Sequence, residues 1–94
     1  MTIRVLAFHY PAPEHRAEMV ERIKRAVEVM RACPGFLDAD CWLEEGGEAV
    51  VATGTFESKE LWLQAMGTVA HADIDFDHDE RELKPRSVQL LLEA

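Results

Sequence analysis

The sequence predicts an α+β fold of the ferredoxin-like βαββαβ type, in which two helices cover one face of a four-stranded antiparallel sheet. Three observations support this prediction. Apolar residues alternate near both ends of the chain, two longer segments repeat them at helical spacing, and a glycine pair separates two strand-like runs. With 94 residues, the chain is expected to form a single domain over residues 1–94.

The first predicted strand covers residues 2–10, and the prolines that follow end it. One of its faces carries Ile3, Val5, Ala7 and His9. From Glu14 to about Cys33 the spacing becomes helical, and Pro13 is well placed to open this helix. Its apolar stripe contains Met19, Val20, Ile23, Ala26, Val27, Met30 and Cys33. Pro34-Gly35 is predicted to end the helix.

Residues 36–56 predict a β-hairpin with Gly46-Gly47 in its loop. A loop of the two glycines alone would place Glu45 directly opposite Glu48, and like charges in that position are destabilising. A four-residue loop, Glu45 to Glu48, is therefore favoured. The resulting register pairs Leu37 with Phe56, Ala39 with Gly54, Cys41 with Ala52, and Leu43 with Val50. This face is entirely apolar, and its centre consists of small residues.

Ser58 is predicted to cap a second helix, in which Gly67-Thr68 is a candidate point for a kink or an early end. Its apolar positions are Leu61, Trp62, Ala65, Met66, Val69 and Ala70. An irregular acidic segment, His71–Pro85, follows, and residues 87–93 close the chain as a strand.

The second face of the sheet is also rich in large apolar residues. They are Leu6, Phe8, Trp42 and Val51, together with one face of the last strand. An exposed patch of this kind is typical of a surface that meets a partner. The sequence therefore predicts a homodimer in which the open sheet faces pair about a two-fold axis.

Composition excludes several classes of function. A formal net charge of −8 disfavours nucleic acid as a partner, because phosphate contacts need clustered Lys and Arg. No apolar run approaches the roughly 18 residues of a membrane helix, and no charged-then-apolar leader is present, so we expect a cytoplasmic protein. Cys33 and Cys41 are expected to be reduced, structural thiols. No motif for an organic cofactor or a nucleophilic triad occurs.

The chain resembles the antibiotic-biosynthesis-monooxygenase (ABM) type of dimeric α/β barrel over about residues 2–92. The residues that carry the resemblance are Pro34-Gly35-Phe36, the glycine-containing hairpin, and Thr55-Phe56-Glu57-Ser58 before a helix that begins with Trp62 in its first turn. The resemblance implies a barrel formed by two sheets at a dimer interface and a cavity between the helices and sheet of each subunit. It also implies cofactor-free oxygenation of aromatic polyketides or quinols, or oxidative haem degradation.

The haem-degrading members of the family have an Asn, a Trp and a haem-ligating His. The best matches in this chain are Ala7, Ala65 and His71, so that only the histidine is retained. This departure from the family pattern counts against haem degradation, and no bound cofactor is expected.

Two interpretations remain open for the small-residue face of the hairpin. It lets a helix pack closely, or it floors a pocket for a flat apolar or aromatic ligand. The predicted substrate-binding residues are Met19, Ile23, Ala39, Cys41, Gly54, Trp62, Met66 and Phe76.

Two histidines are candidate catalytic bases. His9 lies near the end of the first strand, and His71 follows the second helix. A neutral imidazole can take the proton of a phenol or quinol, which raises the electron density of the substrate enough for it to react with dioxygen. The alternative for His9 is a rim histidine with no chemical role. His71 is also a candidate ligand or a cation that suits the helix end, and its alternative is likewise no chemical role.

The acidic segment superficially resembles a calcium loop, with alternating Asp73, Asp75, Asp77 and Asp79. The glycine that such a loop requires falls at His78, and its bidentate glutamate falls at Lys84. A metal site is therefore disfavoured, and we expect a solvated, mobile flap over the pocket in which Ile74 and Phe76 can dock.

These observations predict a homodimeric, cofactor-independent monooxygenase-like protein that acts on an aromatic or quinol-type molecule. The alternative is a non-catalytic dimeric barrel that binds a small apolar ligand or a partner protein.

Overall fold

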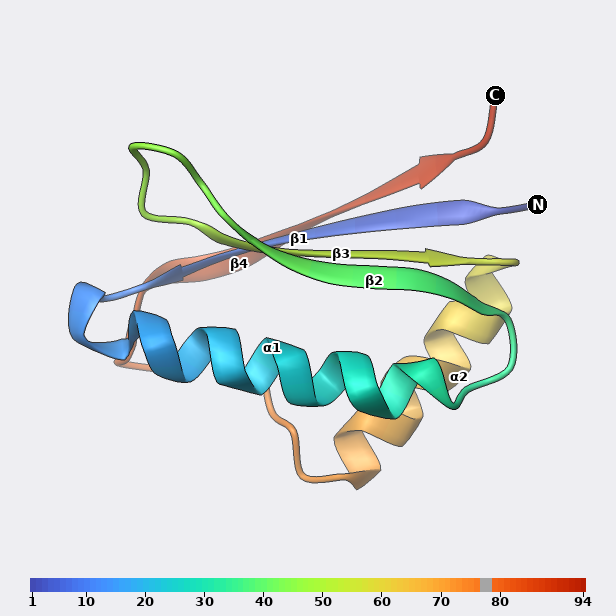
Figure 1. The fold of residues 1–94 in the computed structure, drawn as a ribbon, viewed down its shortest axis with the longest axis horizontal. Helices are drawn as coiled ribbons and strands as arrows, with labels where there is room; N and C mark the ends of the chain where they lie inside the picture. The colour runs from blue at the N-terminus through green and yellow to red at the C-terminus, as the bar shows by residue number, and fades with distance from the viewer. Residues whose placement is uncertain (77–78) are drawn as a thin grey trace.

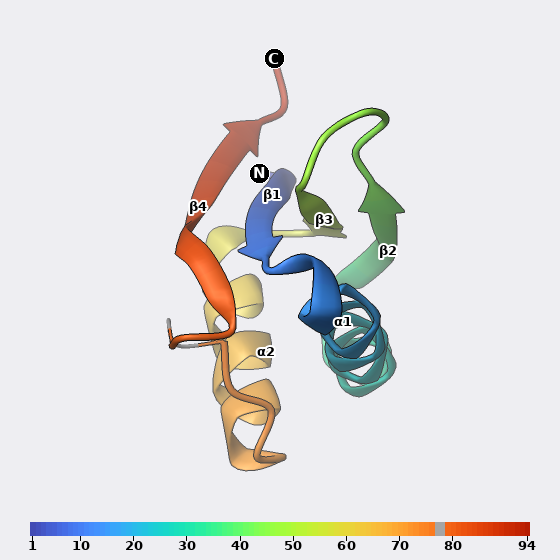
Figure 2. The ribbon, with the colours of Figure 1, turned by 90° about the vertical axis from the view of Figure 1, so that its left-hand side faces the viewer.

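The computed structural model describes residues 1–76 and 79–94 and shows a four-stranded antiparallel sheet with both helices on one face (Figures 1 and 2). The elements are β1 (Ile3–Pro11), a 3₁₀ turn (Pro13–His15), α1 (Arg16–Arg31), β2 (Phe36–Leu43), β3 (Val50–Phe56), α2 (Lys59–His71) and β4 (Glu82–Leu92). The strand order is β2-β3-β1-β4. The predicted βαββαβ fold is confirmed.

The hairpin has the predicted register along most of its length. Ala39 pairs with Gly54 and Cys41 with Ala52. The Glu44 amide donates to the Ala49 carbonyl at 3.0 Å and so closes a four-residue loop.

The prediction was wrong at the other end of the hairpin, where a bulge places Phe36 rather than Leu37 opposite Phe56. The rings of Phe36 and Phe56 then meet edge to face, with their centroids 5.8 Å apart. The backbone beside this pair is closed by a hydrogen bond of 2.9 Å from the Glu57 amide to the Gly35 carbonyl. The fully buried Phe56 ring therefore has a packing partner that the regular register would not supply.

Both helices begin near their predicted positions. The 3₁₀ turn that precedes α1 opens at Pro13, and the Ser58 hydroxyl caps α2 by accepting a hydrogen bond of 3.2 Å from the Leu61 amide. Gly67 does not interrupt α2, which continues to His71. No helix in the described part of the chain has the length and apolar character needed to span a membrane.

Strand β4 begins at Glu82, five residues before the predicted start at position 87. The extension pairs with the end of β1 across an irregular register, Tyr10 with Lys84 and Pro11 with Glu82. Pro85 is tolerated within the strand because β4 lies at the edge of the sheet, where a missing amide donor breaks no ladder on its outer side.

The two helices cover the sheet unequally. Helix α1 packs on β2 and β3 through a buried cluster of Met19, Ile23, Val27, Ala39 and Val50. Helix α2 makes fewer contacts with the sheet, at the end where Phe56 and Ala65 are buried. Figure 2 shows α1 beneath β2 and α2 beneath the β1–β4 side of the sheet. On the opposite face of the sheet Trp42 and Leu91 remain 58% and 47% exposed.

A pair of glycine substitutions tests this packing. Gly35 has a φ of +83°, and a Cβ at this position would overlap the Leu61 side chain. At Gly54 the nearest atom to an added Cβ is 3.8 Å away. We expect Gly35→Ala to lower the free energy of unfolding by about 1–2 kcal/mol or more, and Gly54→Ala to leave it unchanged or raise it by about 0.5 kcal/mol. Urea unfolding of both variants measures the difference, and equal effects would contradict the described geometry.

Candidate functional site

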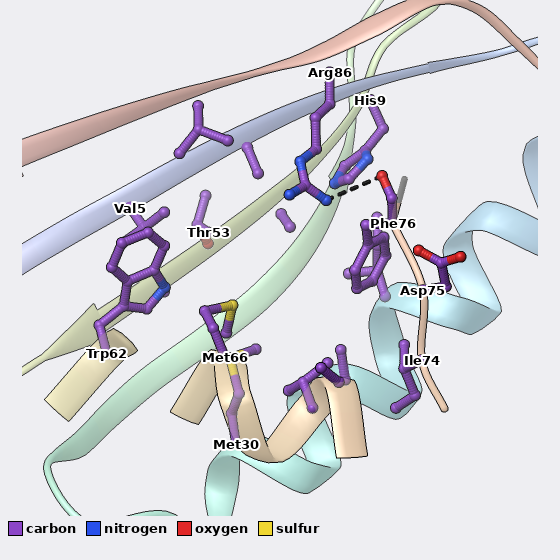
Figure 3. A pocket seen from close by; sticks show the side chains of 18 of the residues that line it. Val5, His9, Met30, Thr53, Trp62, Met66, Ile74, Asp75, Phe76 and Arg86 are labelled. Atoms are coloured by element: carbon purple, nitrogen blue, oxygen red, sulfur yellow. Dashed lines mark hydrogen bonds between the residues drawn. The ribbon is translucent and has the colours of Figure 1, made fainter. Parts of the chain in front are cut away.

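A cavity of about 710 Å³ lies between α2 and the sheet. Its floor is formed by β1, β3 and β4, and α1 and residues 73–76 contribute to its walls. The volume is in the range that accommodates a small organic ligand. Most of the lining is apolar, and the polar exceptions include His9, Asp73, Asp75 and Arg86 (Figure 3).

Several predicted site residues meet in this cavity: His9, Ile23, Gly54, Trp62, Met66 and Phe76. They come from β1, α1, β3, α2 and the segment after α2, so the fold brings together residues from most of the chain. Their assigned roles stay predictions, and the structure gives their positions.

The other predicted site residues do not line the cavity. Met19 and Ala39 are buried in the cluster between α1 and β2, and Cys41 packs against the same cluster. The small residues of β2 therefore admit α1 closely, which is the alternative considered for this face. Of the predicted small-residue floor, Ala52 and Gly54 on β3 line the cavity, whereas Ala39 and Cys41 on β2 do not. His71 is exposed at the last residue of α2 and is also absent from the lining.

His9 is the most deeply buried polar residue of the cavity lining, with 2% of its surface exposed. Strand β1 directs it to the same face as Ile3 and Val5, where its ring lies 5.2 Å from that of Phe76. Its Nδ1 atom is buried and has no hydrogen-bond partner among residues 1–76 and 79–94. Burial lowers the pKa of His9 to about 4, and the positive charges of Arg86 and Arg22 act in the same direction. The imidazole is therefore neutral at physiological pH.

Arg86 reaches the cavity from β4, in the part of the strand that precedes the predicted start at position 87. Its Nη1 donates to the Phe76 carbonyl at 3.1 Å, and its guanidinium carbon lies 5.9 Å from the centre of the Phe76 ring. Arg86 and Val88 share the helix-facing side of β4, since Val88 pairs with Ala7. Side chains alternate between the two faces of a strand, so the position of Arg86, two residues before Val88, is the sequence signal that places it on the same face.

Arginines fasten the segment after α2 to the rest of the fold. Arg22, only 7% exposed, donates to the Asp75 carbonyl at 3.3 Å and to Glu18 at 2.9 Å. Arg81 pairs with Glu18 and with Asp79, and its guanidinium lowers the pKa of Asp79 to about 2.

Ile74 is buried and Phe76 is half-buried, so the described part of the predicted flap is docked. Asp77 and His78, which the flap and calcium-loop predictions also include, lie outside the described residues. Within the described ranges no group of three potential metal ligands is found.

The fold recurs in solved structures of low sequence identity. A conserved protein from Methanosarcina mazei Go1 superposes with a TM-score of 0.87 and 18% identity, covering 100% of this chain and 94% of that one. SnoaB, a cofactor-independent oxygenase from Streptomyces nogalater, gives 0.69 and 19%, covering 99% and 92%. A variant of MhuD with two manganese protoporphyrin IX molecules bound per active site gives 0.70 and 18%, covering 99% and 94%.

The family to which the chain belongs is identified from its sequence. No curated protein sequence matches the chain. The model of the antibiotic biosynthesis monooxygenase family, however, matches residues 2–74, which include β1, α1, the hairpin and α2. These are the elements that supply most of the cavity lining. The chain therefore belongs to the antibiotic biosynthesis monooxygenase family.

Proposed function

We propose that the protein is a homodimeric, cofactor-independent monooxygenase that acts on an aromatic or quinol-type molecule in the cavity beneath α2. The observation that carries the proposal is the state of His9 in a largely apolar cavity. Its imidazole is neutral, and its buried Nδ1 atom has no hydrogen-bond partner among the described residues. Family membership and the likeness to SnoaB support the same class of activity.

The proposed reaction needs no redox group from the protein. His9 accepts a proton from an acidic phenol, or from an acidic C–H group next to an aromatic carbonyl, and the resulting anion is electron-rich enough to reduce dioxygen. For a methylene substrate, one oxygen atom of dioxygen becomes the carbonyl oxygen of the product. The other oxygen atom leaves as water with the two hydrogens of the methylene group, so that the substrate supplies all the electrons.

A pKa of about 4 makes His9 a weak base in the free cavity. Proton transfer from the substrate changes this balance, because the oxyanion that forms beside the imidazolium stabilises its charge at low dielectric. Arg86 stabilises the same oxyanion from the β4 side. The ring of Trp62 and the side chain of Met66 supply an apolar surface for an aromatic substrate.

The homodimer is proposed from the sheet face that the helices leave open. Trp42 and Leu91 are exposed there, and Leu6, Phe8 and Val51 are half-buried. A second copy that pairs through this face would remove the patch from water and leave the cavity, on the other face of the sheet, accessible.

The alternative function is non-catalytic binding of a small apolar ligand, which the apolar character of the lining favours. Haem binding through His71 fits less well. That residue lies outside the cavity lining, and the positions matched to the Asn and Trp of haem-degrading relatives are Ala7 and Ala65.

The first test is oxygen consumption with a panel of quinols, phenols and anthrones. We expect His9→Ala to lower kcat/KM by about 10²–10⁴-fold, the usual contribution of a general base, and His71→Ala to have little effect. Loss of activity in His71→Ala with retention in His9→Ala would overturn the assignment of the base. An absence of turnover with every substrate would favour the binding alternative.

A second test concerns the protonation state of His9. Its pKa rises from about 4 in the folded chain to about 6.5 on unfolding, so the unfolded state binds more protons between these values. Acidification through that window should destabilise the fold by up to about 3 kcal/mol. His9→Gln should lack this loss of stability, because it has no imidazole at position 9, while it keeps the other acid-sensitive groups of the wild type. Urea unfolding at neutral pH and near pH 4 measures the difference, and identical pH profiles would contradict a buried neutral imidazole.

A third test separates the dimer from the cavity. We expect light scattering to show a dimer at micromolar concentration and Trp42→Asp to shift it to monomer. Gly54→Leu should leave the dimer intact but weaken ligand binding, because its side chain would enter the cavity. A wild-type monomer would overturn the proposed association.

A further inference from the structure

We propose that the cavity selects aromatic ligands that carry an ionised carboxylate, and that Arg86 is the specificity-determining residue that pairs with this group at one end of the cavity. The inference deepens the proposed function and rests on it only in placing the ligand in the same cavity. A preference for an acid can be measured whether or not the ligand is oxidised.

The cavity has two chemically different ends. Figure 3 shows Val5, Trp62, Met66 and Met30 along one side and Arg86 with His9 at the other. An aromatic ring that lies against Trp62 and Met66 leaves the opposite end of the ligand beside Arg86. The apolar end supplies affinity for the ring, and the polar end decides which substituent is accepted.

Arg86 has hydrogen-bonding capacity that the fold does not use. A guanidinium has five N–H donors, and among the described residues Arg86 makes one hydrogen bond, from Nη1 to the Phe76 carbonyl. No ion pair links Arg86 to a carboxylate within residues 1–76 and 79–94. That hydrogen bond and the stacking on Phe76 fix the guanidinium at the cavity and leave N–H groups available for a planar, bidentate acceptor.

The charges that act on this end of the cavity are positive, although the chain as a whole carries −8. Among the described residues, the side-chain charges that add to burial in lowering the pKa of His9 are those of Arg86 and Arg22. In Figure 3 the carboxylate of Asp75 lies on the α1 side of Phe76, away from Arg86. Arg86 is the cation among the described lining residues, and low-dielectric walls concentrate its field toward an anion in the cavity.

The Nδ1 atom of His9 is a second polar group at the same end, and it has no hydrogen-bond partner among the described residues. A ligand with a hydroxyl group next to its acidic group would satisfy both residues, because the hydroxyl can hydrogen-bond to Nδ1 while the carboxylate engages Arg86. A neutral ligand would leave the guanidinium without an anionic partner. The proposal therefore predicts discrimination against the neutral analogue of the same shape.

The test compares β-naphthoate with its neutral amide, β-naphthamide, by calorimetric titration of the 94-residue chain. We expect wild-type protein to bind the acid about five- to tenfold more tightly than the amide. Arg86→Gln should abolish this preference by weakening only the binding of the acid. Arg86→Lys should retain part of it, because lysine keeps the positive charge but cannot make the bidentate contact of a guanidinium. Raising the salt concentration should shrink the preference of the wild type.

Arg31→Gln is the matched control. It removes the same charge from a guanidinium that stacks on Phe36, 5.6 Å from its ring centre, outside the cavity lining. We expect this variant to keep the wild-type preference. Equal binding of acid and amide by the wild type, absence of binding of both probes, or a preference that survives in Arg86→Gln would overturn the inference. The salt titration needs no variant, so the test stands even if Arg86→Gln does not fold.

The outcome is separable from that of the oxygenase proposal. A preference for the acid without oxygen consumption on any substrate would overturn the proposed reaction and leave the assignment of Arg86 standing. Oxygen consumption with neutral quinols and no preference for the acid would do the reverse.

Discussion

The close packing of α1 on β2 and β3 is the constraint on which the cavity depends. On β2 the small residue Ala39 lets Met19 and Ile23 of α1 pack closely against the sheet. The helix-facing side of β2 is thereby filled by α1. Helix α2 is held to the sheet at one end, where Ala65 packs near Phe56, and it contacts the sheet less than α1 does. The cavity is the space that this unequal covering leaves.

The segment after α2 converts that space into a site with defined chemistry. Arg22 holds it at the Asp75 carbonyl, and Arg86 holds it at the next carbonyl, that of Phe76. The Phe76 ring then lies against His9 and excludes water from it. The same two arginines that fix the segment also lower the pKa of His9. Arg22 and Arg86 therefore both hold the segment after α2 in place and contribute to the charge around His9.

Much of the fold could be predicted because the signals are local. The alternation of Ile3, Val5, Ala7 and His9 predicted that His9 shares a face with the other three, and the structure places that face toward the helices. The Ser58 cap and the four-residue hairpin loop are likewise short-range features. The site was predicted less well, because the packing of α1 on β2 takes up Met19, Ala39 and Cys41, whereas Gly54 and Met66 face the cavity. Sequence periodicity does not contain that information.

The sequence by itself determined the order of elements, the faces of the strands and the family, because these follow from residue spacing and turn chemistry within single segments. Only the tertiary structure decided where the cavity lies and that Arg86 belongs to it. Both depend on the irregular pairing of β1 with β4, which extends β4 to Glu82, and on the closer contact that α1 makes with the sheet than α2 does. That difference in packing is set by side chains far apart in the chain, whose volumes act together only after folding.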